Sequence, residues 1–490
     1  MDINFTNIKS FLLDNKTVKQ TIFKNTFWLT VAEGISQFLK LILIIYVARI
    51  LGATEYGKFT FALSFLSLFA IFSDFGLSSI TTRELSREKD KEKEFSSILS
   101  LKILLSIGAL ILMLIGSLFV TADPAIQRVI WILAVFVLIN SFSEIIYAFF
   151  RARQQMQYEA LTGILQAVAI TGVGFFILFN FPSVENLSYS YLFASSIAFV
   201  FILFVFHFKV FSLKLSFKKS IWKQFLAMSW PLGFVTIFSI IYNQIDSVMM
   251  GYWGQITETG WYNAADGLAR VTLIPPFLIS TSFYPVLSIA FKESKEKLQK
   301  VWDYQMRIII LMVIPMVIGG LVLAPRIIDF VYSSSFSPSI LVFQILIITS
   351  GIIYLITLLN LVLTASNQQK KNFWITLSGA IVNIVLNLIL IPKYSLYGAA
   401  IATLITFLLM FILYLISTAK FTSISPLNSK VFLVSFSAVL ASVPMYFTIS
   451  LPLVFNLNVL LTVLVGAIIY LISLFIFNEI FKLNLIFKNE

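Results

Sequence analysis

Fourteen long apolar stretches constrain the fold of this chain more than any other feature. Each approaches the ~20 residues that a helix needs to cross ~30 Å of hydrocarbon. Inside a bilayer a backbone finds no water, so each stretch must satisfy its own hydrogen bonds as a helix. The chain is 59% hydrophobic and 12% charged, too few polar residues to cover a water-soluble domain. We therefore predict an all-α polytopic membrane protein with these approximate spans: 25–48, 58–80, 96–120, 127–150, 158–180, 187–208, 226–252, 264–289, 303–324, 339–363, 372–391, 396–417, 430–450 and 454–478.

Lysine and arginine provide a test of this count, because they concentrate in the cytoplasmic loops of membrane proteins. In the predicted topology, 26 of them lie on one side, termed here the basic side, and 5 on the opposite side. The bias alternates with each helix. It predicts a protein of the cytoplasmic membrane with both termini in the cytoplasm. The net charge of +12 then reflects topology, and we expect no nucleic-acid partner.

Several classes of activity are excluded by what the sequence lacks. There is no cysteine and only one histidine, His207, so neither a thiolate nor a histidine metal site is expected. No GxxxxGK[ST] phosphate loop occurs. The loops of the opposite side are too short to hold a catalytic domain. The sequence predicts a transporter, not an enzyme, with no catalytic residues and no metal or organic cofactor.

Two similar glycine turns predict an internal repeat. Gly52 and Gly57 follow the first span, Gly254 and Gly260 follow the seventh, and an aromatic residue stands two positions after each turn. Such turns are common after helices, so the pattern alone is weak. Six helices return the chain to its starting side, which makes the predicted repeat parallel. The predicted organisation is a cytoplasmic or interfacial N-terminus 1–24, an N-lobe 25–208, a cytoplasmic linker 209–225, a C-lobe 226–417, two peripheral helices within 430–478 and a cytoplasmic tail 479–490.

Two segments carry a resemblance to a known family. They read VARILGATEYGKFTFALSFLSLFAIFSDFGLSSITTREL and IDSVMMGYWGQITETGWYNAADGLARV. They resemble the polysaccharide-biosynthesis flippases, including O-antigen flippases, of the multidrug/oligosaccharidyl-lipid/polysaccharide exporter superfamily. Helix count and lobe layout extend the resemblance to the whole chain. It implies a flippase that carries a polyprenyl-linked oligosaccharide to the outer leaflet by alternating access, with the bilayer and glycan-assembly proteins as partners.

Ionisable residues inside the spans are candidates for a transport path, because each costs about 3 kcal/mol near the bilayer centre. In the first span Glu33, Gln37 and Lys40 share one face at helical spacing. One interpretation is that they line a lumen in which Lys40 attracts an anionic substrate. The other is that Glu33 and Lys40 neutralise each other structurally.

The seventh and eighth spans contain further polar positions. Asn243 lies about one turn before Asp246, and this pair either faces the lumen or makes interhelical hydrogen bonds. Asp266 and Arg270 are four residues apart, so a local ion pair competes with a lumenal role for Arg270. Pro275 and its neighbour Pro276 should bend or break the eighth span.

The resemblance implies an anionic pyrophosphate–sugar headgroup, and guanidinium binds phosphate oxygens bidentately. An electropositive lumen would suit such a substrate. We therefore favour Lys40 and Arg270 as cationic contacts. The candidate substrate-binding residues are Lys40, Arg270, Asn243, Asp246 and Glu33.

Two acids near the basic side, Asp74 and Glu144, are candidates for coupling transport to H⁺ or Na⁺. The alternative for Glu144 is an ion pair with Arg151, seven residues on and therefore on the same face.

Other functions stay open at this point. A multidrug exporter or a lipid II flippase of the same superfamily would share the fold. A non-transporting membrane scaffold of a glycan-assembly complex would tolerate neutralisation of the buried charges.

Overall fold

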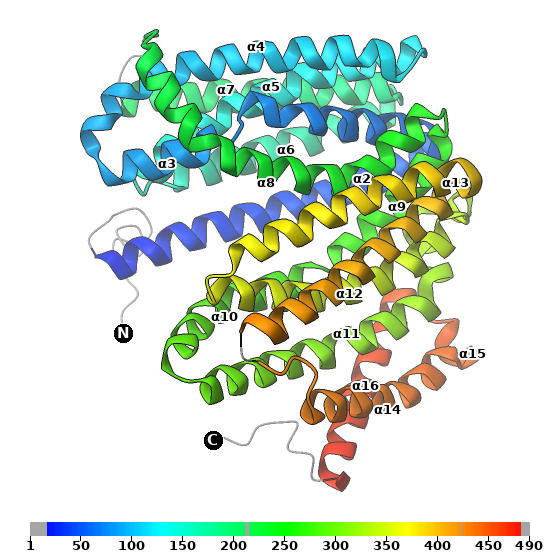
Figure 1. Ribbon diagram of the computed structural model, residues 1–490. Coiled ribbons are helices and arrows are strands. Elements are labelled where there is room, and N and C mark those ends of the chain that lie inside the picture. Colours follow the sequence, from blue (N-terminus) through cyan, green and yellow to red (C-terminus); the bar gives the residue numbers. More distant parts are fainter. Residues whose placement is uncertain (1–16, 211–214, 423, 482–490) are drawn as a thin grey trace, which may run out of the picture. The chain divides into compact units, whose positions relative to one another are not determined.

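A computed structural model describes residues 17–210, 215–422 and 424–481, and every regular element in these ranges is a helix (Figure 1). The N-terminal half contains α2 (Val18–Ala70), η1 (Ile71–Ser73), α3 (Leu77–Arg87), η2 (Lys89–Glu94), α4 (Phe95–Val120), α5 (Pro124–Ala152), α6 (Gln157–Asn180), α7 (Val184–Lys209) and α8 (Lys219–Tyr252). It is followed by α9 (Ile256–Val271), α10 (Ile274–Glu293), α11 (Lys295–Tyr332), η3 (Ser334–Phe336), α12 (Ser339–Ala365), α13 (Gln369–Phe421), α14 (Ser429–Ser450), α15 (Pro452–Phe455) and α16 (Val459–Phe481). Most of the predicted interfacial N-terminus and tail lies outside the described residues.

The chain forms two compact units, unit 1 from Met1 to Gly260 and unit 2 from Trp261 to Glu490. Helix α9 begins in unit 1 and continues in unit 2. Each unit is described by itself below. The division into lobes 25–208 and 226–417 stays a prediction.

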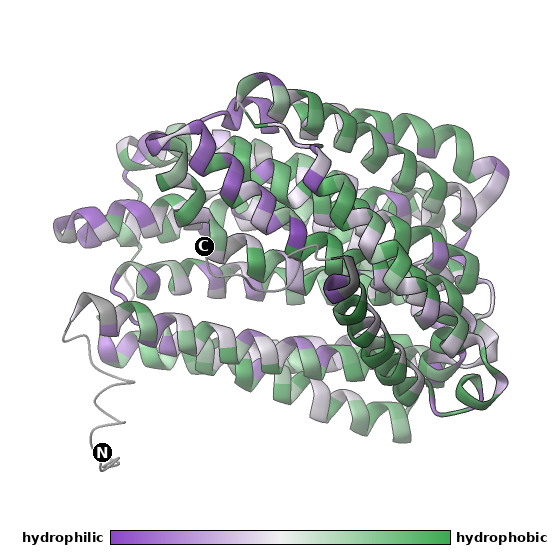
Figure 2. Cartoon of the chain, turned by 90° about the horizontal axis from the view of Figure 1, so that it is seen from below, coloured by the Kyte–Doolittle hydropathy of each residue, from purple (hydrophilic) through white to green (hydrophobic). Residues whose placement is uncertain are grey.

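The described helices account for the predicted number of membrane crossings. Ten are long and apolar enough to span a bilayer, and two bent helix pairs raise this number to twelve. Both α2 and α13 have 53 residues, about 80 Å at 1.5 Å per residue, which is enough for two crossings each. α2 is kinked at Gly52 and α13 at Ser395. The protein is therefore a multi-pass membrane protein with about fourteen transmembrane helices. Hydrophobic residues cover most of the helices, and hydrophilic ones gather toward helix ends and loops (Figure 2).

Capping residues and prolines explain where the helices begin. Asp123 accepts a hydrogen bond from the backbone of Ala125, and Pro124 follows it at the first helical position of α5. Ser183 caps α7 in the same manner, through the backbone amide of Asn186. Pro275 and Pro276 stand at the start of α10, directly after the chain leaves α9, which confirms the predicted break.

The two predicted glycine turns lie against each other within unit 1. Gly52 and Gly254 both have positive φ angles, +78° and +75°, which a glycine adopts without strain. The hydroxyls of Thr54 and Thr257 are 2.8 Å apart, and each threonine stands three residues before its second glycine. A Cβ atom on Gly57 would lie 1.9 Å from the carbonyl oxygen of Ile256. Gly260 has the matching constraint, with a Cβ only 2.0 Å from the Ala53 carbonyl oxygen. The sequence repeat is thus a pair of turns in close backbone contact.

In unit 2, the last two long helices pack on α11. The amide of Asn428 donates to Asp303 at 2.7 Å, and the hydroxyl of Tyr470 donates to the Leu311 carbonyl at 2.8 Å. At the other end of α11, Arg326 donates to Thr462 at 3.1 Å. Many side chains of α14 and α16 are apolar and exposed, among them Phe432. Such a surface suits contact with lipid.

Candidate functional site

The candidate site in unit 1 begins where α2 and η1 end. Phe75 and Gly76 have positive φ angles, +45° and +79°, and break the helix before α3. A positive φ is unusual for a bulky residue such as phenylalanine. Asp74 stabilises the break, because its carboxylate accepts hydrogen bonds from the hydroxyl and the backbone amide of Ser78. The break places a carboxylate at the basic-side end of the second predicted span.

Lys102 of α4 neutralises this carboxylate. Its ammonium group lies 2.7 Å from Asp74 Oδ1, and its side chain is 0% exposed. A buried charge without a partner is strongly unfavourable, so the pair ties α4 to the break. Sequence reasoning did not single out Lys102. The available signal was a lysine inside the third apolar span, where a charge needs a partner.

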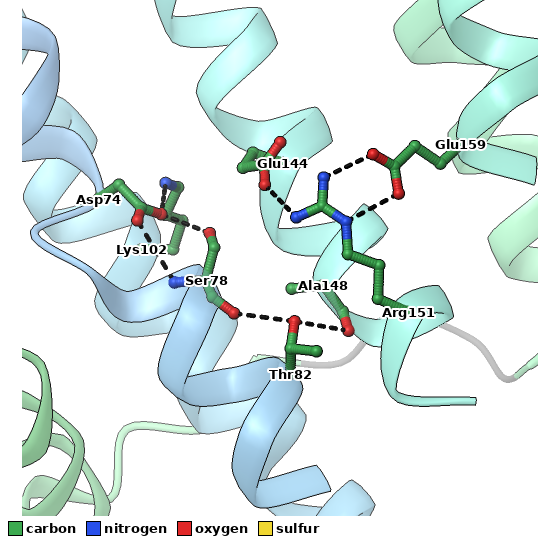
Figure 3. A network of polar contacts seen from close by, with 8 residues as sticks. All are labelled: Asp74, Ser78, Thr82, Lys102, Glu144, Ala148, Arg151 and Glu159. Atoms are coloured by element: carbon green, nitrogen blue, oxygen red, sulfur yellow. Dashed lines mark hydrogen bonds and ion pairs between the residues drawn. The ribbon is translucent and has the colours of Figure 1, made fainter. Parts of the chain in front are cut away.

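A second group of charges joins α5 and α6 (Figure 3). Arg151 donates to Glu144 at 2.6 Å, so the pair anticipated from the spacing is present. The same guanidinium makes two hydrogen bonds to Glu159, at 2.8 Å and 2.5 Å. Glu159 was missed in the sequence because it lies on the next helix, beyond helical spacing from Arg151.

Thr82 of α3 connects the break to α5. Its hydroxyl lies 3.1 Å from the Ser78 carbonyl and 3.2 Å from the Ala148 carbonyl (Figure 3). The hydroxyls of Ser73 and Ser141, only 2.6 Å apart, make a further link between η1 and α5. We use "the charge network" for Asp74, Lys102, Glu144, Arg151 and Glu159.

The helix break also packs closely on α8. A Cβ atom on Gly76 would lie 2.9 Å from the carbonyl oxygen of Ser229, and one on Gly233 would lie 3.0 Å from the ring of Phe75. Pro231 lies inside α8, which bends by 41° shortly after it, between Phe234 and Thr236. Two irregular segments therefore meet without space for larger side chains.

The other predicted site residues of unit 1 lie on α2 and α8. Glu33 and Lys40 are exposed on the first half of α2, and Gln37 donates to Glu33 at 2.7 Å. Asn243 donates to the Ser239 carbonyl at 2.7 Å. Asp246 is only 4% exposed. In this conformation the side chains of Lys40 and Glu33 are exposed, whereas Asp246 is covered by protein.

Arg270 lies in unit 2 and forms the local ion pair with Asp266, at 2.5 Å. Its side chain is 44% exposed. Exposed ion pairs of this spacing contribute little stability. The lumenal role of Arg270 stays a prediction.

Outside the spans, Glu84 of α3 receives hydrogen bonds from Lys91 at 2.8 Å and Arg83 at 3.0 Å. The hydrogen bond from Lys91 is the main reason that the pKa of Glu84 lies below its ordinary value of 4.5. Among the described residues no group of three or more His, Cys, Asp or Glu side chains could hold a metal ion.

Comparison with known proteins assigns the family. The model of the family described as "Polysaccharide biosynthesis protein" matches residues 22–291, more than half of the chain. The chain belongs to this family. The relatives named below include a probable glycan biosynthesis flippase, in agreement with a transporter that is not an enzyme.

Two curated relatives cover most of the chain. The "Probable low-salt glycan biosynthesis flippase Agl15" of Haloferax volcanii is 23% identical over 390 residues, 78% of this chain and 80% of the relative. The "Capsular polysaccharide biosynthesis protein CapF" of Staphylococcus aureus is 23% identical over 398 residues, 78% of this chain and 96% of that protein.

Solved structures show the same fold. A lipid II flippase, MurJ, in an inward closed conformation superimposes with a TM-score of 0.75 at 18% identity, covering 92% of this chain and 99% of that chain. An inward-facing multidrug resistance MATE transporter gives 0.65 at 15% identity, covering 81% and 98%. At these identities the likeness concerns architecture alone.

Proposed function

We propose that this protein is a flippase that carries a polyprenyl-(pyro)phosphate-linked oligosaccharide across the cytoplasmic membrane for surface polysaccharide or glycan synthesis. The observation that carries the proposal is the family match, extended by a named glycan flippase that aligns over about four fifths of both chains. The many-helix fold agrees with translocation across a membrane.

The proposed substrate has an anionic headgroup and an apolar tail. Lys40 and Arg270 are the proposed cationic contacts, since both are exposed within apolar helices. The tail stays in lipid while the headgroup crosses by alternating access, with the basic side in the cytoplasm. Glu33, Asn243 and Asp246 are proposed to complete the polar path. Of these, Asp246 would become accessible only in another conformation.

Export complementation tests this proposal. A deletion strain receives the wild type, Lys40→Ala, Arg270→Ala, Arg270→Lys or Asp246→Asn at matched membrane abundance. We expect the Ala variants to lose surface glycan and accumulate lipid-linked precursor, and Arg270→Lys to be partly active because it keeps the charge. Arg49→Ala is the control, because Arg49 is an exposed residue near the kink of α2.

The assay also separates the competing functions. Normal surface glycan in the deletion strain would contradict the flippase proposal and favour an exporter of other compounds. Accumulation of the cell-wall precursor lipid II, with normal surface glycan, would identify a lipid II flippase. Normal export in every variant would contradict the proposed substrate contacts of Lys40, Arg270 and Asp246. The hypothesis of a non-transporting scaffold would then be favoured.

A further inference from the structure

The charge network contains more negative than positive groups. Its carboxylates are Asp74, Glu144 and Glu159, and its cations are Lys102 and Arg151 (Figure 3). With each group in its usual ionised state, one carboxylate has no cation of its own. An uncompensated charge among packed membrane helices is unfavourable, and a single bound proton would remove it.

Asp74 does not carry the excess charge. Lys102 contacts it at 2.7 Å and is completely buried, so protonating Asp74 would leave the ammonium without its partner. Ser78 supplies two further hydrogen bonds that favour the ionised carboxylate. This pair is balanced as it stands.

Arg151 divides its contacts unequally between the two glutamates. Glu159 receives two hydrogen bonds in a bidentate arrangement, which is the stronger geometry. Glu144 receives one, at 2.6 Å. The side chain of Glu144 is 40% exposed, against 16% for Glu159. Glu144 is thus the less tightly held carboxylate and the more accessible one.

We propose that Glu144 is the carboxyl group that binds and releases the coupling proton of this transporter. The inference rests on the proposed flippase function. A proton from water at the basic side binds a carboxylate oxygen of Glu144 and makes the network neutral, while Arg151 stays with Glu159. Release of the proton restores the excess negative charge. Thr82 links α5, the helix that carries Glu144, to the break through the Ala148 and Ser78 carbonyls, and the break packs on α8. The change of charge therefore occurs close to the place where two irregular segments meet.

The surroundings of Glu144 favour a proton over a metal cation. The charged groups close enough to act on it are Arg151 on its own helix, Glu159 on α6 and Asp74 at the break. Lys102 of α4 is also within electrostatic range. A sodium ion would have to bind beside the guanidinium of Arg151, 2.6 Å away, and would be repelled by it.

Infrared spectroscopy of the full-length protein in liposomes provides the test. The carbonyl stretch of protonated carboxylic acids is followed from about pH 8 to about pH 5, a range above the ordinary titration of exposed acids. In wild type we expect one band that appears on acidification. It should be lost in Glu144→Gln and kept in the double variant Asp74→Asn with Lys102→Met, which removes the balanced pair and leaves the excess of one carboxylate unchanged. In Glu159→Gln it should appear only at lower pH, because the remaining glutamate then has Arg151 to itself.

A band that persists in Glu144→Gln, or that disappears in the double variant Asp74→Asn with Lys102→Met, would overturn the assignment. A band that responds to sodium at constant pH would show a cation site in its place.

Glycan export by the same variants separates this inference from the flippase function. We expect Glu144→Gln to abolish export and Glu144→Asp to retain it. Full export by Glu144→Gln would refute coupling at Glu144 while leaving the flippase function intact, whereas normal glycan in the deletion strain would refute the function itself.

Discussion

Glu84 stabilises the fold in a pH-dependent manner that can be measured directly. The Lys91 hydrogen bond lowers its folded-state pKa below 4.5, so the unfolded state binds more protons in that range. Its contribution to the free energy of unfolding is therefore complete above the ordinary pKa and is lost as pH falls through the folded pKa. We expect Glu84→Gln to lower the unfolding temperature at about pH 7. It should have no effect at a pH below the folded-state pKa of Glu84, where the carboxyl group is already protonated. Thermal unfolding of the wild type and the variant in detergent, at neutral and at acid pH, measures this difference.

Glu88→Gln is the matched control, because Glu88 contacts the same lysine at 3.4 Å but is largely exposed. Exposed pairs of this kind contribute between zero and about 1 kcal/mol. Equal effects of the two substitutions at every pH would contradict the role of Glu84.

Lys102 is expected to be the most sensitive charged residue of unit 1. Lys102→Met leaves Asp74 without its cation, and breaking a buried pair in this way costs about 3–5 kcal/mol. Asp74→Asn together with Lys102→Met should recover much of this loss, because no unpaired charge is left. A double-mutant cycle from denaturant unfolding gives the coupling energy. Additive effects would show that the two side chains act independently.

Helical spacing predicted one ion pair of the charge network, Glu144 with Arg151. It did not predict the pairs that join different helices. Glu144 and Arg151 are seven residues apart, so a single helix brings them together and the sequence was sufficient. Lys102 and Asp74 are 28 residues apart and meet only because α4 packs beside the break. Their pairing depends on tertiary structure, which periodicity does not encode.

The close contact between the glycine turn in α2 and the start of α9 can be tested by crosslinking. The chain has no cysteine, so Thr54→Cys with Thr257→Cys introduces a single possible disulfide. The hydroxyls are 2.8 Å apart, and a disulfide needs about 2 Å between sulfurs, so we expect rapid crosslinking. Adding Gly57→Ala should slow it, because the new Cβ would lie 1.9 Å from a carbonyl oxygen and must push the turns apart. Gel mobility of the oxidised protein gives the rate.

Gly34→Ala serves as the control on the same helix, since nothing lies within 4 Å of a Cβ at that position. If both alanines left the crosslinking rate unchanged, the close contact of the turns would be wrong.

Helix breaks were predictable where prolines or a pair of glycines mark them. Pro275 and Pro276 indicated a break at the start of α10, since proline is tolerated in the first helical turn and disrupts a helix interior. The break at Phe75 and Gly76 carries no proline. Its positive φ angles are held by Asp74 and by contact with α8, so its position depends on packing.

The fold of the chain was largely predictable, because each crossing needs its own run of apolar residues. The charge bias of the loops also predicts which side of the protein faces the cytoplasm, and cysteine labelling can test this orientation. We expect a membrane-impermeant maleimide to label Ala122→Cys, in the exposed loop between α4 and α5, on intact cells. Asp90→Cys, in η2 on the basic side, should react only after permeabilisation. The reverse pattern would invert the topology.

Translocation in a purified system is the direct test of the proposed flippase function. Lipid-linked oligosaccharide extracted from the source cells is placed in both leaflets of liposomes, with and without the full-length protein, and an external periodate pulse oxidises the accessible glycan. We expect the protected inner pool to become accessible quickly only in liposomes that contain the protein, and Lys40→Ala with Arg270→Ala to remove that acceleration. An inner pool that stays protected at the same rate with and without the wild-type protein would contradict the flippase function.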